Sequence, residues 1–165
     1  MTLRVVIMGV CGTGKTSLGM ALSDRLHVPY LDGDDLHPTA NVAKMAAGIP
    51  LTDDDRWPWL DRVAATLSQR APVIVGCSAL RRAYRDRLRA GAGGPVTFLH
   101  LTGPRDIIAA RMAARAGHYM PPALLDSQLA TLEPPTADEA VSLDITQPLD
   151  ALARAAAATI EGHHR

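Results

Sequence analysis

The sequence predicts a single α/β domain in which helices cover both faces of a parallel sheet. Short runs rich in Val, Ile and Leu alternate along the chain with segments of helical periodicity, a pattern typical of parallel sheets. A glycine-rich stretch joins the first apolar run to the first helical segment. The 165 residues allow one domain with a substantial core and are too few for two ordinary domains. We therefore expect one domain over residues 1–165, without internal repeats or linkers.

The first half of the chain predicts two strands and three helices. The strands are short apolar, β-branched runs, whereas the first helix carries Leu18, Leu22 and Leu26 on one stripe. The third helix has Asp53 to Asp55 as candidate N-caps and tolerates Pro58 in its first turn. The predicted strands are residues 3–8 and 28–32, and the predicted helices are residues 15–26, about 40–47 and 53–69.

The second half predicts three more strands, each followed by a helical segment. The strands are the runs APVIVGC, VTFLHL and SLDIT, and the last helix is rich in alanine. The predicted strands are residues 71–77, 96–101 and 142–146, and the predicted helices are residues 80–90, 104–116 and 149–160.

Charge and cysteine content exclude several classes of protein. Seventeen basic residues balance 17 acidic ones, so the chain has no general reason to bind nucleic acid or an anionic membrane. Cys11 and Cys77 belong to no metal-binding pattern and are expected to be free thiols. No segment approaches the roughly 20 apolar residues of a membrane helix. We expect a soluble, cytoplasmic protein.

Residues 9–16, GVCGTGKT, match the phosphate-binding pattern G-x-x-x-x-G-K-[ST] in full. They follow a predicted strand and open a predicted helix, so backbone N–H groups and the helix N-terminus should face phosphate oxygens. Lys15 is expected to bridge the β- and γ-phosphates of ATP, and the Thr16 hydroxyl to ligate Mg²⁺. The predicted nucleotide-binding residues of this loop are Gly9, Val10, Cys11, Gly12, Thr13, Gly14, Lys15, Thr16 and Ser17.

A phosphate loop alone does not separate a kinase from a GTPase, a motor or a regulatory ATPase. In many ATPases an apolar strand ends in Asp, but the third strand here ends IVGCS, and the chain lacks the N-K-x-D pattern of GTPases. The stretch LDGDD after the second strand is the candidate for the missing carboxylate. Asp32 and Asp34 are two apart in an expected extended segment, so their side chains should lie on the same side, whereas Asp35 should point away.

Four blocks of sequence carry a family resemblance. They are GVCGTGKT, LDGDDLHPTANVAKMAAGIPLTDDDRWPWL, CSALRRAYRDRLR and RAGHYMPPALLDSQLATLEPP, and together they span nearly the whole chain. Their order and spacing resemble those of gluconate kinases (gluconokinases). The resemblance implies a P-loop fold similar to nucleoside monophosphate and shikimate kinases, with a five-stranded parallel sheet ordered 2-3-1-4-5. It also implies a substrate-binding insertion at about residues 33–70, a mobile lid at about residues 111–133, and a homodimer.

The activity implied by this resemblance is Mg²⁺-dependent transfer of the ATP γ-phosphate to the 6-hydroxyl of D-gluconate. By similarity to related small-molecule kinases, Asp32 would hold a magnesium-bound water. Asp34 would take the proton of the attacking hydroxyl, which suits a carboxylate. The expected catalytic residues are Lys15, Asp34 and Arg115.

Gluconate carries a carboxylate, so its pocket needs a fixed cation, and the planar fork of arginine fits best. Arg56 is the leading choice, followed by Arg81 and Arg85. His37 either lies in the pocket or makes a structural hydrogen bond, and Lys44 either faces the sugar acid or is solvated. The Trp57–Trp59 pair favours core packing over stacking on a sugar. The predicted substrate-binding residues are Asp34, His37, Lys44, Arg56, Ser78, Arg81, Arg85, His118 and Gln128.

The lid segment places Arg111 and Arg115 four apart, on one helical face. In related kinases such arginines clamp the phosphates of ATP and exclude water when the lid closes. Arg115 is expected on the γ-phosphate, and Arg111 on adenine or the α-phosphate. By analogy alone, Gln147 and Pro148 would bracket the adenine.

Two alternatives remain open from the sequence. One is a P-loop kinase for another small hydroxy acid, such as shikimate or a different sugar acid. The other is a nucleotide-dependent regulatory or binding module that has kept the fold without the chemistry. The loop lysine, the paired carboxylates and the lid arginines favour an enzyme over that module.

Overall fold

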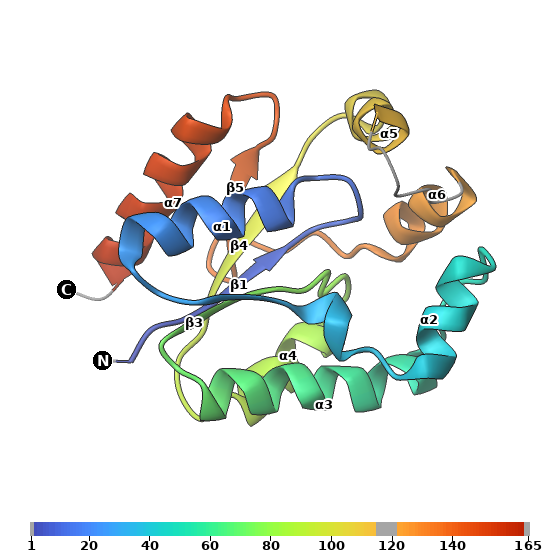
Figure 1. Cartoon of the computed structure of the whole chain (residues 1–165), viewed down its shortest axis with the longest axis horizontal. Coiled ribbons are helices and arrows are strands. Elements are labelled where there is room, and N and C mark those ends of the chain that lie inside the picture. Colours follow the sequence, from blue (N-terminus) through green and yellow to red (C-terminus); the bar gives the residue numbers. More distant parts are fainter. Residues whose placement is uncertain (1, 115–121, 164–165) are drawn as a thin grey trace.

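A five-stranded parallel sheet forms the centre of the protein, in a computed structural model that describes residues 2–114 and 122–163. The strand order is β2-β3-β1-β4-β5, which confirms the predicted order (Figure 1). Each neighbouring pair is parallel, as the alternation of strands and helices predicts. The strands are β1 (Arg4–Met8), β2 (Tyr30–Asp32), β3 (Val73–Gly76), β4 (Thr97–Thr102) and β5 (Val141–Asp144).

Helices cover both faces of the sheet. Helices α1 and α7 pack together on one face, and α3 and α4 pack together on the other (Figure 1). Within the described ranges, no helix has the length and apolar character needed to span a membrane. The helices are α1 (Lys15–Leu26), α2 (Thr39–Ala46), α3 (Asp53–Gln69), α4 (Arg82–Gly91), α5 (Arg105–Ala114), α6 (Pro122–Thr131) and α7 (Leu149–His163), with the 3₁₀ helix η1 at Gly33–Leu36.

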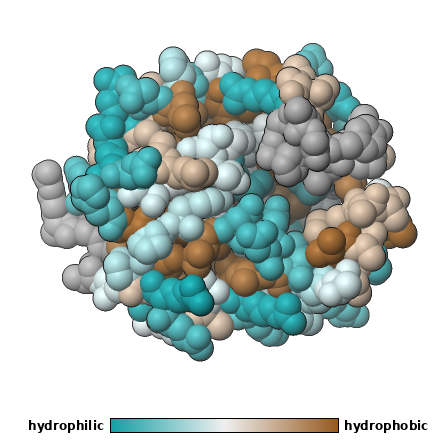
Figure 2. Space-filling model, in the orientation of Figure 1, coloured by the Kyte–Doolittle hydropathy of each residue, from teal (hydrophilic) through white to brown (hydrophobic). Residues whose placement is uncertain are grey.

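The core lies on both sides of the central strands. Four consecutive residues of β1, Val5 to Met8, have no exposed surface, as expected for a strand buried on both faces. On the face shown in Figure 2, hydrophilic and hydrophobic residues are interspersed over the helices. The buried apolar residues of the strands and of helices α1, α3, α4 and α7 form one core cluster, which packs the helices against the sheet.

The Tyr30 side chain fits between two glycines. A Cβ at Gly19 would lie 2.1 Å from the Tyr30 ring, and a Cβ at Gly76 would lie 2.3 Å from its hydroxyl oxygen. The absence of side chains at Gly19 of α1 and Gly76 of β3 makes room for the tyrosine ring. The Tyr30 hydroxyl then lies 3.5 Å from the Thr16 hydroxyl at the start of α1. The two glycines thus fix the packing of β2 beside the phosphate loop.

Two local features differ from the sequence prediction. The N-cap of α3 is Thr52, not one of the three aspartates after it. Its side chain accepts a hydrogen bond from the Asp55 N–H, and the Asp55 carboxylate accepts one from the Thr52 N–H at 2.9 Å, which forms a capping box. Helix α6 was not predicted as a separate helix, because the sequence marks that segment mainly by its prolines.

Candidate active site

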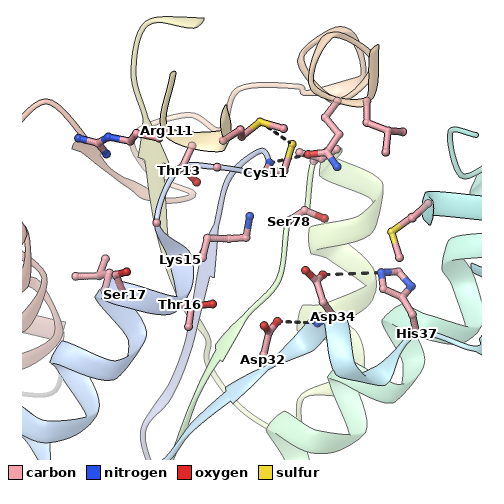
Figure 3. Close-up of a pocket in the computed structure, with 18 of the residues that line it drawn as sticks. Cys11, Thr13, Lys15, Thr16, Ser17, Asp32, Asp34, His37, Ser78 and Arg111 are labelled. Carbon is pink, nitrogen blue, oxygen red and sulfur yellow. Dashed lines mark hydrogen bonds and ion pairs between the residues drawn. The ribbon is translucent and has the colours of Figure 1, made fainter. Parts of the chain in front are cut away.

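A cavity of about 890 Å³ lies at the carboxyl ends of the strands, where open α/β sheets bind ligands. The phosphate loop, η1, α5, α6 and the start of α7 contribute to its wall. Figure 3 shows Lys15, Asp34, Ser78 and His37 around the same space. The predicted site residues that line the cavity are Cys11 to Ser17, Asp32, Asp34, His37, Arg56, Ser78, Arg111, Gln128 and Gln147.

The phosphate loop has the backbone that its glycines allow. Gly12 and Gly14 adopt φ angles of 81° and 93°, a region that disfavours other residues. The Lys15 ammonium donates to the carbonyl oxygens of Gly9 at 2.9 Å and Val10 at 3.0 Å. The Lys15 side chain therefore folds back onto its own loop. Gly9 and Val10, whose carbonyl oxygens it contacts, do not themselves line the cavity.

The two predicted acids line the cavity, although the local geometry differs from the prediction. The expectation of an extended segment is wrong, because Asp34 lies in the 3₁₀ helix η1. The Asp32 carboxylate caps that helix by accepting the Asp34 N–H at 2.9 Å. Asp35, expected to turn away, also lines the cavity. The turn, rather than strand alternation, brings the acids to the phosphate loop.

The His37 side chain lines the cavity and is held in place by Trp59 and Asn41. Its ring stacks on Trp59 with centroids 4.0 Å apart and an interplanar angle of 17°. Its Nδ1 lies 3.1 Å from the amide nitrogen of Asn41, and its Nε2 lies 3.9 Å from Asp34 Oδ1. Burial, with a smaller contribution from Arg56, lowers the pKa of His37 to about 4, so the ring is neutral near pH 7. Trp59 is 2% exposed and packs in the core, as predicted, although it also lines the cavity; Trp57, the other member of the predicted pair, is only partly buried.

Arg56 presents its guanidinium to the cavity from the first turns of α3. Its Nη1 donates to the Tyr84 hydroxyl oxygen at 2.9 Å, and that hydroxyl donates to Asp53. The side chain is only 12% exposed. A partly desolvated arginine, held by a neighbour and facing a cavity, suits a carboxylate ligand.

Of the predicted substrate residues that the structure describes, three do not line the cavity. Arg85, proposed from sequence as a substrate cation, is 1% exposed and forms an ion pair with Glu139 at 2.6 Å. It also donates to two backbone carbonyls, so the expectation of a substrate contact is wrong. Arg81 lies 3.9 Å from Asp53, and the Lys44 ammonium donates to Asp55 at 2.7 Å. The sequence marks all three as basic but does not show which has an acidic neighbour in space.

The described residues of the predicted lid segment contact the phosphate loop or line the same cavity. The Gln128 side-chain oxygen, from α6, accepts the Cys11 N–H at 2.7 Å, and Cys11 Sγ lies 3.7 Å from Met112 Sδ on α5. Arg111 donates to the Ile145 carbonyl at 2.6 Å, two residues before Gln147, which lies between β5 and α7. Pro148 does not line the cavity.

Two predicted lid residues, Arg115 and His118, lie outside the described residues. Asn41 is a residue that the sequence interpretation missed. It is 3% exposed and contacts His37 and the Asp55 carbonyl. The sequence signal that could have pointed to it is an asparagine four residues after a histidine, a spacing that allows the two side chains to meet.

Fold and site together define a P-loop kinase. A phosphate loop follows β1, carboxylates follow β2, and arginines from α3 and α5 line the same cavity. A shikimate kinase structure from Bacteroides thetaiotaomicron agrees at the level of the fold, with a TM-score of 0.73 at 15% identity over 98% of this chain and 99% of that one.

Closer relatives give the family. A family model described as an AAA domain matches residues 5–135. The thermoresistant gluconokinase of Escherichia coli (strain K12) is 44% identical over 162 residues, which are 94% of this chain and 90% of that protein. The crystal structure of a gluconokinase from Sinorhizobium meliloti 1021 has a TM-score of 0.89 and 48% identity, over 96% of this chain and 91% of that one. This chain belongs to the gluconokinase family.

Proposed function

We propose that this protein is a gluconokinase. It transfers the γ-phosphate of ATP to the 6-hydroxyl of D-gluconate and releases ADP and 6-phospho-D-gluconate. The observation that carries the proposal is that the phosphate loop, Asp34 and Arg56 line the same cavity, in a member of the gluconokinase family. The cavity thus has groups for both substrates and a carboxylate between them.

On the nucleotide side, the loop N–H groups and the N-terminus of α1 bind the phosphates. The Lys15 ammonium, now on the Gly9 and Val10 carbonyls, exchanges these acceptors for β- and γ-phosphate oxygens. The Thr16 hydroxyl and a water held by Asp32 would supply hard oxygen ligands of the kind that Mg²⁺ prefers. When bound, Mg²⁺ neutralises charge on the β- and γ-phosphates.

On the acceptor side, Asp34 orients the 6-hydroxyl and receives its proton. The hydroxyl oxygen forms a bond to the γ-phosphorus as the bond to the β–γ bridging oxygen breaks, and ADP leaves with that electron pair. No covalent enzyme intermediate is required. Arg56 binds the gluconate carboxylate, and Ser78 and His37 contribute hydrogen bonds to the hydroxyl chain.

The lid belongs to the same proposal. Residues 33–70 form the substrate-binding insertion and residues 111–133 the lid. Arg111 serves the adenine end, which is supported by its bond to the Ile145 carbonyl beside Gln147. Arg115 acts on the γ-phosphate, and His118 on gluconate. A cytoplasmic homodimer rests on the family resemblance, and sedimentation of the purified protein tests the dimer.

The test is an assay of ADP release with ATP, Mg²⁺ and D-gluconate, followed by NMR identification of the phosphorylated carbon. We expect phosphate on carbon 6. Shikimate and other sugar acids are assayed in parallel. Activity with shikimate but not gluconate would replace the substrate, and tight ATP binding without transfer to any acid would indicate a regulatory module.

A further inference from the structure

Asn41 determines which atoms of His37 can face a ligand. The Asn41 amide nitrogen lies 2.9 Å from the Asp55 carbonyl oxygen and 3.1 Å from His37 Nδ1. A carbonyl oxygen only accepts hydrogen bonds, so the amide nitrogen, not the amide oxygen, must face it. The same nitrogen then donates to Nδ1. A neutral imidazole that accepts at Nδ1 carries its proton on Nε2.

The imidazole has little freedom to change this arrangement. The Trp59 indole stacks against its face, and the indole N–H is itself fixed on the Gly33 carbonyl at 2.8 Å. The His37 backbone N–H bonds to the Asp34 carbonyl at 3.2 Å, which anchors the ring to η1. The ring edge that remains toward the cavity is the Nε2 edge, beside Asp34 (Figure 3).

The gap between His37 and Asp34 fits one kind of ligand group. At 3.9 Å, Nε2 and Asp34 Oδ1 are too far apart for a good direct hydrogen bond. An Nε2–H only donates and an ionised carboxylate only accepts, whereas a hydroxyl does both. A single hydroxyl in the gap therefore satisfies both groups. A ligand carboxylate or ether oxygen would leave Asp34 facing a second acceptor.

We propose that Asn41 is a positioning residue that holds His37 with its proton on Nε2, so that His37 and Asp34 together bind the acceptor hydroxyl. The hydroxyl donates to Asp34 and accepts from His37 Nε2–H, which leaves one oxygen lone pair for the phosphorus. The hydroxyl-binding part rests on the proposed gluconokinase function. With the proton on Nδ1 instead, both groups would be acceptors and the hydroxyl would have only one proton for them.

The first test measures the tautomer directly. The ¹⁵N chemical shifts of the His37 ring, assigned by their loss in His37→Gln, distinguish the protonated from the unprotonated nitrogen near neutral pH. We expect a protonated Nε2 and an unprotonated Nδ1 in the wild-type protein, and a mixture of tautomers in Asn41→Leu. A protonated Nδ1 in the wild-type protein would overturn the inference without any activity measurement.

The second test links the tautomer to substrate. Asn41→Leu keeps a similar volume and is expected to lower kcat/KM for gluconate about 10- to 100-fold, the range for one buried hydrogen bond to a substrate, with the KM for ATP unchanged. His37→Gln keeps an amide N–H near the Nε2 position and should retain more activity than His37→Asn. Val42→Ala, at an exposed position of the same helix, is the matched control.

The outcomes separate this inference from the proposed function. In the His37→Gln background, Asn41→Leu should add little further loss, because its effect passes through the imidazole. An Asn41→Leu variant with the wild-type tautomer and reduced activity would show a purely structural role and overturn the inference. If the wild-type protein shows the Nε2–H tautomer but phosphorylates no gluconate, the proposed function and the hydroxyl-binding part fail while the tautomer assignment stands.

Discussion

The Asp34 carboxylate is held on a rigid turn rather than on a free loop. Its backbone N–H is bonded to Asp32, and its carbonyl accepts the His37 N–H. We expect Asp34→Asn to fold and bind ATP normally but to lower kcat about 10²- to 10⁴-fold, because the amide cannot take the hydroxyl proton. Steady-state assays and ATP titration measure this, with the exposed Asp54→Asn as control. Near-normal turnover would remove Asp34 from its assigned role.

Tyr84 fixes the direction of the Arg56 guanidinium. Its hydroxyl accepts from Arg56, and its ring lies 5.2 Å from the Arg56 Cζ. Tyr84→Phe removes two hydrogen bonds to charged groups, the one accepted from Arg56 and the one donated to Asp53. Each is worth roughly 1.5–3 kcal/mol, and some of this loss should appear in substrate affinity. We expect the KM for gluconate to rise about 3- to 30-fold and the KM for ATP to stay constant, because the nucleotide binds elsewhere. An equal rise in both KM values would contradict this assignment.

At the scale of elements, a hydrogen bond from the Cys11 N–H to the Gln128 side chain joins α6 to the phosphate loop. Burial raises the pKa of the Cys11 thiol, although Lys15 opposes this, and the side chain is half-buried. Cys77 is fully buried, with its pKa raised to about 12. We therefore expect iodoacetamide to label Cys11 slowly and Cys77 hardly at all, since the thiolate is the reactive form.

Removing the Gln128 contact should expose that thiol. We expect Gln128→Ala to increase the Cys11 labelling rate several-fold and ATP with Mg²⁺ to protect it, as followed by mass spectrometry of tryptic peptides. Cys11→Ser serves as the control and should abolish labelling. Faster labelling of Cys77 than of Cys11 would show that the loop is not open to solvent.

The elements with strong local signals were the predictable ones. Helices α1 and α3 have the predicted bounds, because a glycine-rich loop and an aspartate-rich first turn mark where they begin. The η1 turn was missed because the sequence does not show that the Asp32 side chain accepts the Asp34 N–H. This hydrogen bond caps the 3₁₀ helix and replaces the extended backbone that we expected. Arg85 was misassigned because its partner Glu139 is 54 residues away, and only the packing of α4 brings them together.

At the scale of the whole molecule, two buried histidines make stability depend on pH. Burial lowers the pKa values of His37 and His100 from 6.5 to about 4. Both are neutral in the folded protein at pH values where the unfolded chain binds protons, so their contribution is complete above about pH 6.5 and is lost as pH falls toward 4. Each pKa difference corresponds to at most about 3 kcal/mol.

The corresponding measurement is urea unfolding at several pH values. We expect the free energy of unfolding to fall steadily from about pH 7 to pH 4.5 in the wild-type protein. His100→Gln cannot titrate in this range, so its stability should change less over the same interval. An unchanged pH dependence in that variant would show that His100 does not titrate as described.

The space occupied by Tyr30 ties together three positions that are far apart in the sequence. Residues 19, 30 and 76 share one volume, so a side chain larger than glycine at either end leaves no room for the tyrosine ring. A lineage can therefore enlarge position 19 or 76 only together with a smaller residue at position 30. The tyrosine hydroxyl adjoins Thr16 of the phosphate loop. Substitutions that shift the tyrosine should therefore also be limited by their effect on nucleotide binding. Among homologues, these three positions should change together or not at all.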